Sequence, residues 1–223
     1  MDVDHQKREE YKNYGDDLIM ARYKGPRARV CRRLEYPVFE STKFSSIRKN
    51  YPPGQHGPNR RRGKLSNYGI QLREKQRIKY LYGVLEKQFR NYFKKAISMD
   101  GPTGDNLLIL LESRLDNTVY RLGLASTRRS SRQLVSHKHI LVNNKVVNIP
   151  SYILSEGDTI QIRDKSKKNT IFQESMRRIQ SDNPTEWLLL DKSKLKGTFI
   201  QKPERSQIIE PINEQLVVEL YSK

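Results

Sequence analysis

The sequence has little cysteine, a modest apolar content and no long apolar run. Cys31 is the single cysteine in 223 residues, so neither a disulfide framework nor a multi-thiolate zinc site can form within the chain. No run approaches about 18 consecutive apolar residues, which excludes a transmembrane span, and the segment Met1-Asp2-Val3-Asp4 lacks the apolar core of a secretory signal. Hydrophobic residues make up only 35% of the chain. We therefore expect a soluble intracellular protein with a modest core.

The charge is strongly positive and unevenly distributed. The chain has 43 Lys and Arg against 25 Asp and Glu, a formal net charge of +18. Residues 1–19 are acidic, residues 20–97 hold 21 bases against four acids, and residues 98–223 are close to balanced. So concentrated a charge implies a polyanionic partner, and nucleic acid is the main candidate. RNA and DNA present the same phosphates, so charge alone does not separate them.

The first 65 residues show little regular pattern. Residues 1–19 are polar and without sustained periodicity, which predicts a disordered acidic extension. Residues 20–65 are rich in Pro, Gly and cations, including the run Arg60-Arg61-Arg62-Gly63-Lys64. We expect this basic segment to be irregular and to order mainly against its partner.

Helical periodicity begins near Ser66. Apolar residues recur at spacings of three and four along 66–82 and again along 84–97, with cations mostly off those faces, which predicts two amphipathic helices. A third helix is expected through Leu107–Leu122. The segment 213–221 favours a helix, although its valines leave a strand open.

A compact module with short strands follows the third helix. Ser126 or Thr127 is placed to cap a helix over 128–135. The β-branched runs 140–142 and 145–147 flank Asn143-Asn144, which tolerates the positive φ angles of a tight hairpin. Further strands are expected at 159–163, 187–190 and 197–200, and a helix at 171–179.

The sharpest functional signal lies in the helix over 128–135. Arg128 and Arg132 are four residues apart and so share one helix face, while Leu134 and Val135 turn toward a core. No acid occurs from Ala125 to Ser155, and guanidinium groups suit phosphate. We therefore predict a face that contacts the phosphate backbone of a nucleic acid here. The full set of candidate RNA-binding residues is Arg22, Lys24, Arg27, Arg29, Arg60, Arg61, Arg62, Lys64, Arg73, Lys75, Arg77, Lys79, Arg90, Arg128, Arg129, Arg132, Gln133, Ser136, His137 and Lys138.

Several motifs resemble one family. The stretch 114–158, which opens Arg114-Leu115-Asp116-Asn117, resembles the S-four RNA-binding domain. Pseudouridine synthases and tyrosyl-tRNA synthetases also carry that domain, but the flanking motifs are similar to the bacterial-type S-four family of small-subunit ribosomal proteins. These motifs are Met20-Ala21-Arg22-Tyr23, Tyr51-Pro52-Pro53-Gly54-Gln55-His56-Gly57, Leu72-Arg73-Glu74-Lys75-Gln76, Gln88-Phe89-Arg90, Leu111-Glu112-Ser113-Arg114, Asn148-Ile149-Pro150-Ser151-Tyr152 and Asn213-Glu214-Gln215-Leu216.

The resemblance implies an α+β fold with two lobes. An all-helical lobe over 66–113, completed by about 198–223, would carry an inserted α+β S-four lobe over 114–197 with an antiparallel sheet and its core motif at 114–163. An irregular basic N-terminal arm at 20–65 would lie on RNA. Many members hold zinc with four N-terminal cysteines, but Cys31 stands alone and Ala28 occupies a neighbouring ligand position, so we expect no metal and no cofactor.

The resemblance also implies a function in translation. The protein would bind small-subunit rRNA at a multi-helix junction of its 5′ domain, nucleate subunit assembly, contact protein S-five and support accuracy, with basic residues near the mRNA entrance. The ribosome would be bacterial and cytoplasmic, with mitochondrial or plastid ribosomes left open. Two alternatives are an RNA-modifying enzyme, for which the chain has no enzyme motif and no room, and a free-standing RNA-binding regulator or DNA-binding protein.

Overall fold

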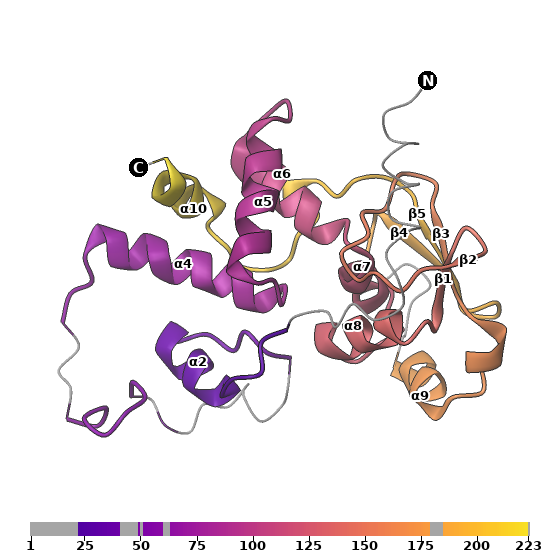
Figure 1. Cartoon of the computed structure of the whole chain (residues 1–223), viewed down its shortest axis with the longest axis horizontal. Helices are drawn as coiled ribbons and strands as arrows, with labels where there is room; N and C mark the ends of the chain where they lie inside the picture. Colours follow the sequence, from indigo (N-terminus) through magenta and orange to yellow (C-terminus); the bar gives the residue numbers. More distant parts are fainter. Residues whose placement is uncertain (1–21, 41–48, 50, 60–62, 179–184, 223) are drawn as a thin grey trace.

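The chain folds into two lobes with an N-terminal segment alongside them (Figure 1). The structure, a computed structural model, describes residues 22–40, 49, 51–59, 63–178 and 185–222. The helical lobe contains α4 (Asn67–Leu81), α5 (Glu86–Ile97), α6 (Thr103–Glu112) and α10 (Glu214–Tyr221). The second lobe combines a five-stranded sheet with α7 (Leu115–Arg121), α8 (Arg128–Ser136) and α9 (Thr170–Arg178).

The helical lobe forms where the sequence predicts amphipathic helices. Ser66 caps α4 by accepting a hydrogen bond from the Gly69 amide at 3.2 Å, and Asn213 caps α10 by accepting one from the Leu216 amide. The segment at 213–221 is thus a helix, and the strand alternative is wrong. The core of the helical lobe joins residues 78–111 to residues 208–217, so the chain returns to this lobe after forming the second one.

The expected single helix over Leu107–Leu122 is wrong, because the chain breaks at Ser113–Arg114 and forms α6 and α7 instead. The Ser113 carbonyl accepts a hydrogen bond from the Leu154 amide at 2.9 Å, and the Leu115 amide donates to the Tyr152 carbonyl at 2.8 Å. A distant segment therefore takes over backbone groups that a continuous helix would have paired internally. Periodicity did not reveal this, since the apolar pattern runs through the break.

The sheet of the second lobe is entirely antiparallel, which confirms the α+β class. Its strand order is β2-β1-β3-β5-β4. The strands are β1 (Ile140–Val142), β2 (Lys145–Val146), β3 (Thr159–Ile162), β4 (Leu188–Asp191) and β5 (Lys196–Phe199). Asn143 and Asn144 turn the β1–β2 hairpin with φ angles of 48° and 65°, as predicted.

One face of this sheet packs against α7 and α8. Alternate strand residues, such as Ile140, Val142, Ile160 and Ile162, are buried in a single core with Leu122. Gly197 of β5 permits the close approach of α7, because a Cβ at that position would lie 2.5 Å from the Leu122 side chain. The sheet therefore holds α7 and α8 in fixed positions.

The N-terminal segment, residues 22–40, differs from the irregular structure expected for it. It contains helix α2 (Arg27–Leu34), whose Val30, Cys31 and Leu34 are buried in a small core with Val38 and Phe39. Tyr80 of α4 packs against this core. The apolar residues were too few to stand out among the cations, yet a helix face of three residues suffices because α4 covers it.

Candidate nucleic-acid interface

Helix α8 presents a polar face at the edge of the second lobe. Thr127 caps it by accepting a hydrogen bond from the Ser130 amide at 3.1 Å, as the sequence predicts. Leu134 and Val135 are buried in the core. The exposed side chains of α8 and of the turn that follows it are Arg129, Gln133, His137 and Lys138, while Ser136 is half-buried and donates to the Arg132 carbonyl.

Arg128 is buried and does not lie on the exposed helix face that the sequence predicts. Its guanidinium lies 2.5 Å from Glu40 Oε1 and 2.6 Å from Glu210 Oε1. Its Nε donates to Asn117 at 2.8 Å, and the group stacks 4.5 Å from the centroid of the Tyr120 ring. Burial opposes its charge, but its neighbours raise the pKa of Arg128 above the usual range. Arg128 therefore has a structural role, because it joins Glu40, Asn117 and Glu210.

Arg132 is also paired internally. Its Nη1 lies 3.2 Å from Asp116 Oδ2, and the same carboxylate lies 2.6 Å from Arg114. Partial burial lowers the pKa of Arg132, and the proximity of Arg114 adds to that effect. The acid-free face expected for Arg128 and Arg132 does not exist, because acids distant in sequence meet both arginines in space.

The N-terminal segment presents a second set of cations. The apolar side of α2 packs against α4, which turns its basic residues outward. Arg22, Lys24, Arg27 and Arg29 are all exposed. These four candidate residues keep the accessibility that RNA binding requires.

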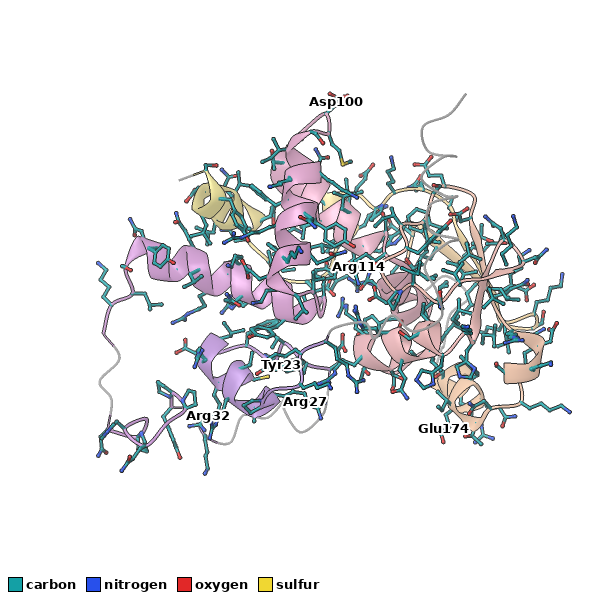
Figure 2. The ribbon with its side chains drawn as sticks, in the orientation of Figure 1. Tyr23, Arg27, Arg32, Asp100, Arg114 and Glu174 are labelled. Atoms are coloured by element: carbon teal, nitrogen blue, oxygen red, sulfur yellow. The ribbon has the colours of Figure 1, made fainter. Side chains whose placement is uncertain are left out.

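The cations of α2 and α8 meet. Arg129 Nη2 donates to the Tyr23 carbonyl at 3.3 Å, across 106 residues of sequence. Partial desolvation, together with the nearby positive charges of Arg27 and Arg22, lowers the pKa of Arg129. Tyr23 and Arg27 are labelled in Figure 2, where the N-terminal segment lies beside α8. We call the exposed residues Arg22, Lys24, Arg27, Arg29, Arg129, Gln133, His137 and Lys138 the α2–α8 surface.

The candidate cations of α4 are instead engaged by glutamates. Lys75 is buried and lies 2.6 Å from Glu86, so it is not exposed as the sequence predicts for an RNA-binding residue. The other pairs are Lys79 with Glu86 at 3.4 Å, Arg77 with Glu74 at 2.9 Å and Arg73 with Glu35 at 3.0 Å. The guanidinium of Arg77 also donates to the Leu34 carbonyl. These cations fasten α2 and α5 to α4.

The remaining candidate residues belong to neither α2 nor α8. Arg90 on α5 has a 65% exposed side chain, which approaches Glu86 to 3.9 Å. Lys64 is exposed just before α4. Arg60, Arg61 and Arg62 lie outside the described residues, as does the acidic extension at 1–19.

Sequence reasoning missed the structural role of Arg32. Its Nε and Nη2 donate to the carbonyls of Tyr51 and Pro52, both at 3.0 Å, and its guanidinium lies 4.6 Å from the Tyr51 ring centroid. A Cβ on Gly57 would lie 2.0 Å from the Pro52 carbonyl oxygen, so only glycine fits this turn. In the sequence, the Pro52-Pro53-Gly54 motif was the feature that could have indicated this turn. Gln55 and His56 are exposed on this loop, residues 51–59.

Cys31 lies in an apolar setting. It is buried in the core of the N-terminal segment, and burial raises the pKa of its thiol. Across the residues that the structure describes, no group of three or more His, Cys, Asp or Glu side chains is arranged to hold a metal ion. Within those same ranges, no helix is both long enough and apolar enough to cross a membrane.

Comparisons with known proteins agree with the fold. Residues 22–112 match the family "Ribosomal protein S4/S9 N-terminal domain", and residues 113–160 match the "S4 domain". The chain is 54% identical to the small ribosomal subunit protein uS4 of Christiangramia forsetii and 52% to that of Chlorobaculum tepidum, each over 204 residues. Both alignments cover 92% of this chain and 100% of the relative. The chain therefore belongs to the uS4 family of small ribosomal subunit proteins.

Proposed function

We propose that the protein is a primary rRNA-binding protein that nucleates assembly of the small ribosomal subunit and supports translational accuracy. As a member of the uS4 family, it is a structural constituent of that subunit and not an enzyme. Family membership also argues against the free-standing regulator and the DNA-binding protein. Its relatives come from bacteria, which supports a bacterial ribosome.

The observation that carries this proposal is the α2–α8 surface. Arg22, Arg27 and Arg129 are close enough for the first two charges to lower the pKa of the third. Gathering like charges is unfavourable in the free protein and becomes favourable when phosphates lie between them. Guanidinium groups also match phosphate geometry with two parallel hydrogen bonds.

The finer partners follow from the same surface. Its donors come from two segments and are mainly guanidinium and ammonium groups, which suit phosphates. We therefore infer recognition of RNA shape more than of base edges, as at a multi-helix junction of the 5′ domain. Contact with protein S-five and with mRNA near its entrance is proposed from the family resemblance. These contacts would use other faces of the molecule.

The test is the salt dependence of binding to a 5′-domain fragment of small-subunit rRNA. Engaging about six phosphates should cost roughly three powers of ten in affinity between 50 and 200 mM salt. A large-subunit rRNA fragment of equal length serves as the control and should bind more weakly at every salt concentration. A log–log slope shallower than about −2, or equal affinity for both RNAs, would contradict the proposal.

A further inference from the structure

We propose that Glu40 is a positioning residue that fastens the N-terminal segment to α8 and so assembles the α2–α8 surface from its two parts. The inference rests on the proposed function, because it concerns how the RNA-binding surface is built. Glu40 carries a negative charge in a protein that binds a polyanion, so it would be expected to weaken binding. Its contacts indicate the opposite effect.

Both oxygens of the Glu40 carboxylate contact Arg128, the first residue of α8. Oε2 accepts a hydrogen bond from the backbone amide of Arg128 at 2.9 Å, and Oε1 lies 2.5 Å from Arg128 Nη1. The first amides of a helix lack partners within the helix, and the positive end of the helix dipole favours an anion there. With its side chain only 19% exposed, Glu40 makes both contacts largely away from water.

The same carboxylate fixes the part of the segment that carries cations. Phe39, next to Glu40 in the chain, stacks on Tyr23 with ring centroids 6.4 Å apart and an angle of 13° between the rings. The Tyr23 carbonyl accepts the hydrogen bond from Arg129. Glu40, Phe39, Tyr23 and Arg129 thus form a continuous chain of contacts from one end of the segment to the face of α8.

The helical lobe contacts both the segment and α8, and Glu40 joins these two elements directly. Tyr80 of α4 packs edge-on against Tyr23 and Phe39, with centroids 5.1 and 6.2 Å away. These contacts hold the segment on α4, while α8 contacts the helical lobe through Arg128, which lies 2.6 Å from Glu210 and 5.1 Å from the centroid of the Tyr82 ring. Glu40 with Arg128 and Tyr23 with Arg129 make direct hydrogen bonds between the segment and α8. The contact of Glu40 with Arg128 is also an ion pair.

The experiment compares Glu40→Ala with Glu35→Ala as a matched control. Each variant removes one negative charge from the same segment, but the Glu35 side chain is 40% exposed and forms an ion pair with Arg73 of α4. Both variants keep every residue of the α2–α8 surface. Affinity for the 5′-domain fragment and its salt dependence are measured alongside the melting temperature.

We expect Glu40→Ala to bind at least about tenfold more weakly than the wild type, although its net charge is more favourable. Its log–log salt slope should become shallower by about 1.5 to 2, because two or more phosphate contacts are no longer made together. Glu35→Ala should bind within about twofold of the wild type, or more tightly, with an unchanged slope. A residue that only stabilises the fold would leave the slope unchanged well below the melting temperature.

A double-mutant cycle supplies an independent readout. If Glu40 acts by placing Arg22 and Arg27 beside Arg129, then Arg22→Gln with Arg27→Gln should cost much less affinity in the Glu40→Ala background than in the wild type. If Glu40→Ala shows no cooperative melting transition, Glu40→Gln replaces it under the same criteria.

Wild-type affinity and slope in Glu40→Ala, or additive losses in the cycle, would overturn the inference. Failure of the proposed function has a different signature, because the wild type itself would then show no preference for the small-subunit fragment.

Discussion

Arg128 and Arg129 are neighbours in the chain and have opposite roles. Arg128 is buried between Glu40 and Glu210, whereas Arg129 is exposed beside Arg27 and Arg22. A single helical step turns one side chain inward and the next outward, so the two arginines allow folding and RNA binding to be separated by mutation.

Arg128→Ala should destabilise the protein by about 3–5 kcal/mol, because two mostly buried carboxylates lose a shared cation. Arg129→Ala should change the free energy of unfolding by no more than about 0.5 kcal/mol and weaken rRNA binding several-fold. Urea denaturation and filter binding measure both quantities. Equal stability of the two variants would show that the Arg128 pairs contribute nothing net.

Glu210 makes the free energy of unfolding depend on pH in the acidic range. Burial opposes its charge, but Arg121 and Arg128 outweigh that effect and lower its pKa below the ordinary 4.5. Its stabilising contribution is therefore complete above about pH 5 and is lost as the pH falls through the lower folded-state pKa. The free energy of unfolding of the wild type should fall more steeply from pH 5 to pH 3 than that of Glu210→Gln. Parallel curves would show that Glu210 does not contribute to the loss of stability in acid.

At the scale of elements, the sequence predicted the regular parts well. Helices α4, α5, α8 and α10 and the asparagine hairpin follow from periodicity, capping and turn chemistry, which are local signals. The break between α6 and α7 and the helix in the N-terminal segment were not predictable in that way. Both depend on partners far along the chain, namely residues 152–154 for the break and Tyr80 for α2.

The packing of α2 changes what proteolysis should show. A wholly irregular segment would be cut quickly in the free protein at every cation, but residues 30, 31 and 34 are buried against α4. Trypsin should therefore cleave slowly after Arg29, Arg32 and Arg33 even without RNA, at a rate close to that after Arg77 in α4. Mass spectrometry of the early fragments checks this. Rapid cleavage after Arg32 or Arg33 in the free protein would contradict the packed helix.

A second prediction at this scale concerns the loop at 51–59, which Arg32 holds by hydrogen bonds to the carbonyls of Tyr51 and Pro52. Gly57→Ala places a Cβ against the Pro52 carbonyl, which must move and thereby disturb the grip of Arg32. Gly54→Ala is the control, since a Cβ there meets nothing within 4 Å, although its φ of 116° adds some strain. We expect Gly57→Ala to lower the melting temperature more than Gly54→Ala. The reverse order would show that the turn is not closely packed.

For the whole molecule, composition predicted the partner class but not the binding surface. The net charge of +18 pointed to nucleic acid, and the family comparison agrees. Which cations are available was a different question. The cations of α4 pair with Glu35, Glu74 and Glu86, and Arg128 and Arg132 on α8 pair with acids from other elements. Only the folded chain separates cations that hold the structure from cations that face a partner.

The most direct test of the central claim compares two variants with equal charge. Arg22→Gln, Arg27→Gln and Arg129→Gln together remove three charges from the α2–α8 surface. Lys165→Gln, Lys168→Gln and Lys194→Gln remove three exposed charges elsewhere on the second lobe. At about 100 mM salt, the first variant should bind the 5′-domain rRNA fragment roughly 100-fold more weakly than the wild type, and the second within about fivefold of it. Equal losses in the two variants would contradict the account, since net charge and not this surface would then determine binding.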